Sequence, residues 1–256
     1  RIINDRTRKE MKKVLKEMRQ ILRCSYSHIP ETKGCMEHIG KNESEGGCGV
    51  WCCREISPQV LYSEFLNTWH FLVNNWNDNE IIDLCVDCAR IYIFGRKGRP
   101  CVFLDEKTGL CKQHDTRPYA CRMFGITPEE EYKPRYERLK ILYPETRQQC
   151  NLVSPVDGRT ITKKDTDDWW KKTLAAESLL GIIYNKIHDG PGGSYRTYYD
   201  HLLLHIMGEE GLEHLTIIRQ SNDILFKEES LSVIRRSIQA FVEKKKQEYA
   251  VATAKN

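Results

Sequence analysis

Apolar residues recur at helical spacing near the start of the chain. Over residues 5–23 they form one stripe, and the opposite face is strongly basic. Such a stripe predicts an amphipathic helix that packs on a core and leaves its lysines in water, while a helix that binds a partner or an acidic surface is the alternative. The stripe consists of Met11, Val14, Leu15, Met18, Ile21 and Leu22.

The same pattern predicts two helices further along. Ser57-Pro58 offers a cap and a first-turn proline, so a helix is expected over residues 59–76. A second helix is expected over residues 80–94 and should end at Gly95. Between residues 24 and 47 the periodicity is lost and Gly, Ser, Pro and Asn become frequent, which predicts a loop.

The last third of the chain is nearly all helical by this criterion. A charged and aromatic helical stretch at 128–143 is followed by helices expected over 165–187, around His201 and His205, and over 230–249. The two histidines lie one turn apart, but they lack the intervening catalytic glutamate of metalloproteases. We therefore interpret them as structural.

Cysteine is the compositional outlier, with eleven residues in a chain of 256. Small disulfide scaffolds are usually much shorter, and an odd count leaves one thiol unpaired. Metal or cluster ligation is therefore the favoured interpretation, and a reducing, cytoplasmic compartment is expected.

Three thiols are expected to converge around a hairpin. Cys101 and Cys111 lie at the ends of two short extended runs, and residues 105–109 have the composition of a turn. Arg117-Pro118 then ends the extended run, and Cys121 follows on a helical turn. This pattern predicts a metal pocket formed by a hairpin and the turn after it.

Further candidate ligands lie upstream in a glycine-rich segment. Cys48, Cys52 and Cys53 follow Gly46-Gly47, and glycines let the backbone fold around an ion or cluster. Because neighbouring side chains diverge on a regular backbone, Cys52 and Cys53 are not expected to serve one site in the same way.

The order of these motifs resembles a known family. Gly-Cys-x-x-x-Cys-Cys-Arg, Cys-x-Phe-Leu, Leu-Cys-x-x-His and Arg-Pro-x-x-Cys-Arg-x-Phe follow one another within residues 48–150. The series is similar to the YkgJ-type cysteine-cluster proteins, to which zinc or iron chelation is attributed and which are distantly similar to flagellin lysine-N-methylases. The resemblance implies ligands at Cys52 and/or Cys53, Cys101, Cys111 and Cys121, and Cys150 matches a later cysteine of the family.

Two other pairs of residues are candidates for the same chemistry. Cys85 and Cys88 share one helix face, which suits a metal and also suits ordinary burial or a redox dithiol. Arg117 and Arg122 flank Cys121, and guanidinium donors near thiolate sulfurs stabilise their negative charge. Pairing of these arginines with carboxylates is the alternative.

Charge and motif content narrow the function. The net charge is only +4 and both signs are interspersed, so nucleic acid is not indicated. No run of about 18 apolar residues is present, which predicts no membrane span. The chain has no phosphate loop, glycine-rich cofactor turn or nucleophile elbow, so no catalytic residue is assigned and enzyme activity stays an open question.

Ligand number bears on the choice of metal. A structural zinc site takes four ligands. The surplus of candidate cysteines favours a 4Fe-4S cluster, with Zn²⁺ as the alternative. The candidates are Cys48, Cys52, Cys53, Cys85, Cys88, Cys101, Cys111, Cys121 and Cys150.

The sequence thus predicts a mostly α fold with a small β-hairpin, in which helices wrap a cysteine-rich metal-binding core. Three regions are expected: an N-terminal helix and loop (1–47), a cysteine-cluster domain (48–150) and a helical C-terminal region (151–256). The favoured function is an iron-sulfur redox or accessory module that serves a protein partner. A zinc-stapled interaction domain and a cluster-supported protein lysine N-methyltransferase are the alternatives.

Overall fold

A computed structural model describes residues 5–33, 53, 57–95, 101–105, 107–142, 152–184 and 196–253. These residues are mostly helical, as predicted. The chain forms two compact units, each drawn from separate stretches. The first comprises Arg1–Val50, Glu106–Leu110 and Arg117–Ser194, and the second comprises Trp51–Asp105, Cys111–Thr116 and Tyr195–Asn256. The expected boundaries at residues 47 and 150 stay a prediction.

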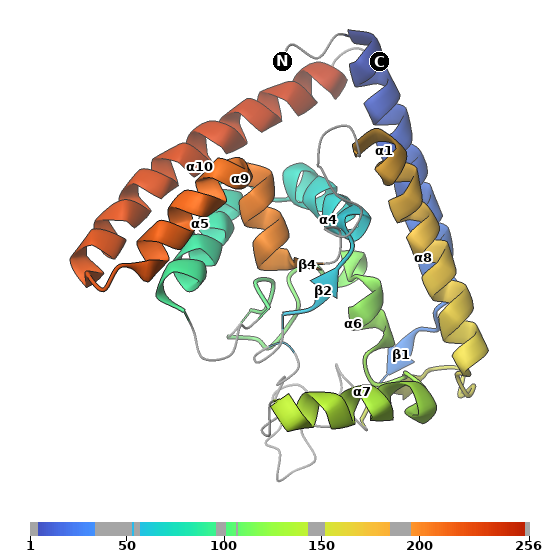
Figure 1. Ribbon diagram of the computed structural model, residues 1–256. Helices are drawn as coiled ribbons and strands as arrows, with labels where there is room; N and C mark the ends of the chain where they lie inside the picture. The colour runs from blue at the N-terminus through green and yellow to red at the C-terminus, as the bar shows by residue number, and fades with distance from the viewer. Residues whose placement is uncertain are drawn as a thin grey trace. The chain divides into compact units, whose positions relative to one another are not determined.

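Two long helices that lie side by side form the frame of the first unit (Figure 1). α1 (Asp5–Tyr26) packs along α8 (Lys163–Tyr184). The predicted stripe of α1 is confirmed by Met18 and Leu22, which are buried. Near the end of α1 the buried Ser25 hydroxyl donates to the Trp169 carbonyl at 3.1 Å, which ties the two helices together.

Short elements complete the first unit. β1 (Thr32–Lys33) pairs antiparallel with β3 (Ser154–Pro155). α6 (Tyr119–Met123) is a short helix that begins after Pro118, and α7 (Glu129–Leu142) confirms the helix expected at 128–143.

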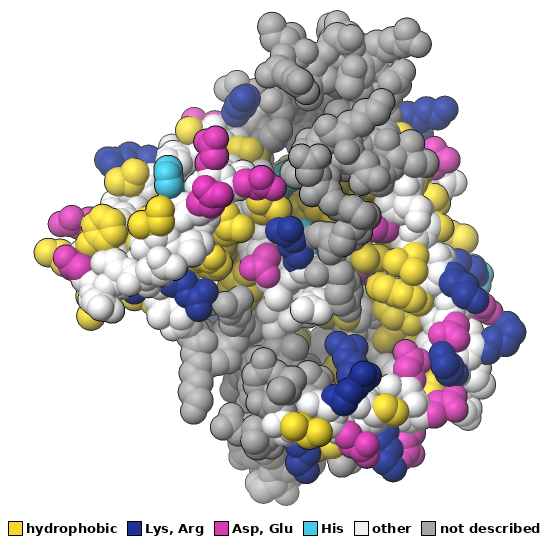
Figure 2. Space-filling view, viewed as in Figure 1, with side chains coloured by type: hydrophobic (Ala, Val, Ile, Leu, Met, Phe, Trp, Pro, Cys, Tyr) yellow, Lys and Arg dark blue, Asp and Glu magenta, His cyan; other side chains and the backbone are white. Residues whose placement is uncertain are grey.

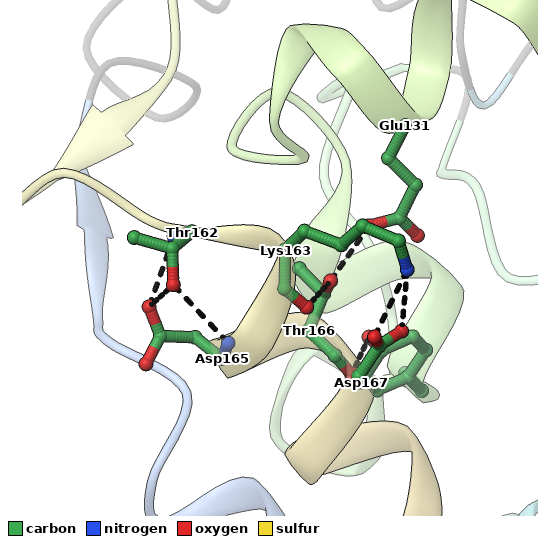
Figure 3. A network of polar contacts seen from close by, with 7 residues as sticks. Glu131, Thr162, Lys163, Asp165, Thr166 and Asp167 are labelled. Carbon is green, nitrogen blue, oxygen red and sulfur yellow. Dashed lines mark hydrogen bonds and ion pairs between the residues drawn. The ribbon is translucent and has the colours of Figure 1, made fainter.

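The start of α8 is fixed by a network of polar side chains (Figure 3). The Thr162 hydroxyl and amide both donate to the Asp165 carboxylate, at 2.6 and 2.9 Å, and the Asp165 amide donates back to the Thr162 hydroxyl at 3.3 Å. Thr166 donates to Glu131 of α7 at 2.6 Å. This reciprocal capping satisfies amides that the first helical turn leaves without partners, so the helix begins here.

The second unit is a group of packed helices with one small sheet (Figure 1). β2 (Gln59–Val60) pairs antiparallel with β4 (Arg196–Thr197). α5 (Asp78–Phe94), α9 (Tyr198–Gln220) and α10 (Ile224–Thr253) pack against one another, and α4 (Tyr62–Asn75) contacts α9. A short 3₁₀ turn, η2 (His114–Thr116), contacts α4.

α5 forms where the sequence predicts it, because both of its ends are specified locally. The Asn77 side chain accepts the Glu80 amide at 3.0 Å, and the Glu80 carboxylate accepts the Asn77 amide at 2.8 Å. At the other end Gly95 adopts a φ of 66°, which only glycine adopts readily.

Two expected elements differ from the structure. The helix predicted from residue 59 begins at Tyr62, because Gln59 and Val60 are extended and pair with β4. The predicted hairpin forms a single antiparallel bridge between Leu104 and Cys111 in the described residues, although Gly109 has the positive φ of 71° expected in its turn.

Charge and hydropathy follow the sequence-based expectations. On the face drawn in Figure 2, basic and acidic side chains of the described residues lie interspersed. Among the helices of the described ranges, none has both the length and the apolar character needed to cross a bilayer.

Candidate metal centre

The described cysteines fall into both units. Cys24 and Cys121 belong to the first unit, and neither is fully buried. The second unit contains Cys53, Cys85, Cys88, Cys101 and Cys111. Cys48, Cys52 and Cys150 lie outside the described residues, so their assignment as ligands stays a prediction.

Cys101 starts a tight turn that is joined to the glycine-rich segment upstream. Its amide donates to the Cys53 carbonyl oxygen at 2.6 Å, and its own carbonyl accepts the Leu104 amide at 3.0 Å. The backbone amides of Phe103 and Leu104 also donate to the Cys101 sulfur. Amide donors aimed at a sulfur favour its thiolate form, which is the form that binds metals.

The second thiol of the predicted hairpin lies beside this turn. Cys111 forms the antiparallel bridge with Leu104, and the Lys112 amide donates to the Phe103 carbonyl at 2.8 Å. Cys53 and Cys111 are both close enough to Cys101 for their charges to raise its pKa. The structure therefore groups three sequence-predicted thiols, from Cys53, Cys101 and Cys111.

α5 contributes a fourth thiol to this group. Cys85 and Cys88 are fully buried on this helix. Burial is the main cause that raises the pKa of Cys88, and the charges of Cys85, Asp87 and Cys101 raise it further. For Cys85, burial alone raises the pKa. Cys88 is thus affected by the charges of both Cys85 and Cys101, whereas the charge of Cys101 does not contribute to the raised pKa of Cys85.

The environment of Cys101 combines features with opposite effects on its charge. Burial dominates and raises the pKa of the thiol, while the two backbone amides lower it. Nearby thiols add mutual repulsion if they ionise, so this group favours neutral thiols in the absence of a cation. A bound metal ion reverses this preference because thiolate ligands are deprotonated on binding.

Thiols are the donor type that binds zinc and iron-sulfur clusters, but the described part of the chain does not assemble a metal site by itself. Within the described ranges, no group of three or more Cys, His, Asp or Glu side chains has the spacing of such a site. We define the "cysteine centre" as Cys53, Cys88, Cys101 and Cys111, the candidate thiols whose charges act on the pKa of Cys101 or, in the case of Cys88, are acted on by Cys101. Four soft thiol donors from three separate segments suit zinc or iron-sulfur chemistry rather than Mg²⁺ or Ca²⁺.

Cys121 and its flanking arginines form a different local arrangement in the first unit. The Arg122 Nε donates to the Arg117 carbonyl at 2.8 Å, and its guanidinium lies 4.6 Å from the centre of the Tyr26 ring. These contacts orient Arg122 through a backbone oxygen and an aromatic face. Convergence of Cys121 with Cys101 and Cys111, and an arginine role toward their sulfurs, stay predictions.

The two histidines of α9 are structural, as expected. The His201 ring is buried, and its Nε2 lies 2.9 Å from the Val60 carbonyl oxygen. His205 packs its ring among Phe65, Trp69 and Phe241. These contacts fix β2 and α4 against α9.

The motif analysis missed the roles of Phe103 and Leu104, whose amides bind the Cys101 sulfur. The Cys-x-Phe-Leu motif predicts the beginning of a strand, whereas Phe103 and Leu104 lie in the turn that follows Cys101. A cysteine followed two and three residues later by the amides of a tight turn is the pattern that indicates this role.

Comparison with known proteins supports metal chemistry for this segment. Residues 44–150 match the family model CxxCxxCC, described as "Putative zinc- or iron-chelating domain". The match confirms the predicted resemblance to the cysteine-cluster family, and it spans all four members of the cysteine centre. No curated protein and no solved structure matches the chain.

Proposed function

We propose that the protein binds an iron-sulfur cluster, of the 4Fe-4S type, at its cysteine centre and serves as a redox or accessory module for a protein partner. One observation carries this proposal. The Cys101 sulfur accepts hydrogen bonds from two backbone N–H groups, and the charges of the Cys53 and Cys111 thiols act on its pKa. The charge of Cys101 in turn raises the pKa of Cys88 on α5.

The local chemistry supports a cationic centre. The thiols of Cys88 and Cys101 remain protonated alone, because burial disfavours their thiolate forms and the charges of nearby thiols disfavour them further. A cationic centre removes that repulsion, and the Phe103 and Leu104 amides stabilise the charge that remains on sulfur. When bound, a cluster of this kind supplies one-electron transfer, with a potential tuned by such N–H donors.

Ligand number favours a cluster over one zinc ion. A structural zinc site takes four ligands, while the sequence offers nine candidate cysteines. In a cluster each thiolate binds a different iron, so several dispersed cysteines can serve one centre.

The experiment is metal and acid-labile sulfide analysis of full-length protein purified without oxygen, together with its visible spectrum. We expect about four irons per chain with matching sulfide, and absorbance that bleaches on reduction. Cys101→Ser should lose both iron and sulfide, while Cys24→Ser, which alters an exposed thiol of α1, should retain them. A colourless wild-type protein without iron would contradict the proposal.

A structural zinc site is the second candidate. Its specific support is the number of members of the cysteine centre, since four thiolates complete a closed zinc site. This candidate predicts a colourless protein with one zinc and no sulfide, whose helices lose stability when the zinc is chelated.

A further inference from the structure

Tyr198 lies outside residues 44–150, the segment that matches the family model. It nevertheless contacts Phe103 and Gln113, which follow Cys101 and Cys111 by two residues each. It opens α9 and is only 1% exposed. Its hydroxyl accepts a hydrogen bond from Gln113 Nε2 at 3.3 Å and is bonded to the Thr68 hydroxyl of α4 at 3.1 Å. A buried tyrosine hydroxyl with two partners fixes both of them in place.

Gln113 transmits this constraint to Cys111. It is the second residue after Cys111, its side chain is buried, and its amide oxygen accepts the Thr116 hydroxyl at 2.6 Å. Both ends of the Gln113 amide are therefore engaged, one by η2 and the other by Tyr198. The backbone that carries Cys111 is anchored to α9 through this side chain.

The Tyr198 ring holds the other thiol-bearing turn. It packs edge-on against the ring of Phe103, with centroids 5.0 Å apart and an interplanar angle of 88°. Phe103 is buried, its amide donates to the Cys101 sulfur, and its carbonyl accepts the Lys112 amide. The Tyr198 ring thus supports Phe103, whose amide donates to the Cys101 sulfur. The Tyr198 hydroxyl supports Gln113, which follows Cys111.

We propose that Tyr198 is a positioning residue for the metal centre, which sets the separation of the Cys101 and Cys111 sulfurs. This inference rests on the proposed metal binding at the cysteine centre. It also implies that the metal-binding domain extends past residue 150, because Tyr198 in the first turn of α9 supports it. Outer contacts that orient ligands typically change metal affinity 10- to 100-fold when they are removed.

The test uses Tyr198→Phe, which keeps the ring packing and removes only the hydroxyl. Tyr92→Phe is the matched control, since the Tyr92 hydroxyl bonds to the Thr216 hydroxyl at 2.9 Å and links α5, one turn after Cys88, to α9, rather than holding the Cys101 and Cys111 segments that Tyr198 contacts. Thr68→Val removes the other end of the Tyr198 bond while keeping the size of the side chain. All are made in the full chain.

The probe is Co²⁺, added without oxygen, because its thiolate charge-transfer absorption reports sulfur ligation whichever metal is native. We expect Tyr198→Phe to bind Co²⁺ about tenfold more weakly than wild type, with lower charge-transfer intensity per bound ion. Tyr92→Phe should stay within about twofold. Thr68→Val should weaken binding in the same direction, and the double variant should be no weaker than Tyr198→Phe because the two changes break one bond.

The outcomes distinguish failure of the Tyr198 role from failure of the proposed metal binding. Wild-type binding with Tyr198→Phe equal to Tyr92→Phe overturns the role of Tyr198 and leaves the proposed function standing. Wild-type protein that contains no iron with sulfide and gives no thiolate absorption with Co²⁺ overturns the proposed function and this inference with it. Circular dichroism of each variant distinguishes a lost site from a lost fold, and Thr68→Val supplies the readout if Tyr198→Phe does not fold.

Discussion

The amide of Cys101 donates a 2.6 Å hydrogen bond to the carbonyl oxygen of Cys53. This bond joins the glycine-rich cysteine segment to the start of the turn that ends at Cys111. It brings together two motifs that the sequence keeps far apart, and Cys53 is the member of the Cys52-Cys53 pair that the structure describes.

Replacement of Cys53 should therefore disrupt metal binding. We expect Cys53→Ser to lose most of the bound metal, because its thiol is coupled to Cys101. Metal content after gel filtration, measured by elemental analysis, checks this expectation. Cys24→Ser is the control, and full metal retention by Cys53→Ser would remove this residue from the cysteine centre.

The two cysteines of α5 should behave differently. The charge of Cys101 acts on Cys88, while burial alone raises the pKa of Cys85. Cys88→Ser should lose metal, whereas Cys85→Ser should keep it and lose about 1–3 kcal/mol of stability, because it buries a hydroxyl in an apolar site. Metal analysis and denaturant unfolding of both variants measure the contrast. Equal metal loss would place Cys85 in the centre as well.

Gly125 should tolerate no side chain. It has a φ of +89°, and an added Cβ would lie 2.6 Å from the Cβ of Val153. Gly125→Ala should cost about 2–4 kcal/mol, from the backbone strain and the crowding together. Gly95→Ala is the control, since its φ is +66° but nothing lies within 4 Å, so a cost of about 1–2 kcal/mol is expected. Chemical denaturation compares the two, and equal losses would show that crowding at Val153 is relieved by relaxation.

The start of α8 should weaken in acid. Hydrogen bonds from the Thr162 side chain and backbone lower the pKa of Asp165 in the folded state. The stability from this group is therefore present above the unfolded pKa of about 3.9 and is lost as the pH falls through the folded value. The Tm difference between wild type and Asp165→Asn should be constant above about pH 5 and should narrow below about pH 4. A difference that widens in acid would contradict this reading of the cap.

Elements with local signals were predictable from the sequence. α1 follows from its apolar stripe, with Met18 and Leu22 buried, and the end of α5 follows from Gly95, while its start at Asp78 after the Asn77 cap lies two residues before the expected one. The start of α4 was wrong because Gln59 and Val60 pair with Arg196 and Thr197, and a strand pairing across such a distance leaves no local pattern.

The sequence indicates the candidate thiols, but it does not indicate the contacts around them. The Cys101 and Cys111 motifs predict two neighbouring thiols, and in the structure Cys111 pairs with Leu104 of the Cys101 turn and its charge acts on the pKa of Cys101; their role as ligands stays a prediction. The contact of Cys53 with Cys101 and the two amide donors depend on backbone geometry that residue type does not determine. The role of Tyr198 could not be predicted, because the sequence alone does not distinguish a tyrosine that supports a metal site from one that packs in an ordinary core.

X-ray absorption spectroscopy at the metal edge of full-length, oxygen-free protein tests the central claim most directly. The account predicts an iron edge with a first shell of sulfur neighbours and a second shell of iron, both of which disappear in Cys101→Ser. A first shell of nitrogen and oxygen donors, or a sulfur shell that Cys101→Ser leaves unchanged, would contradict the cysteine centre.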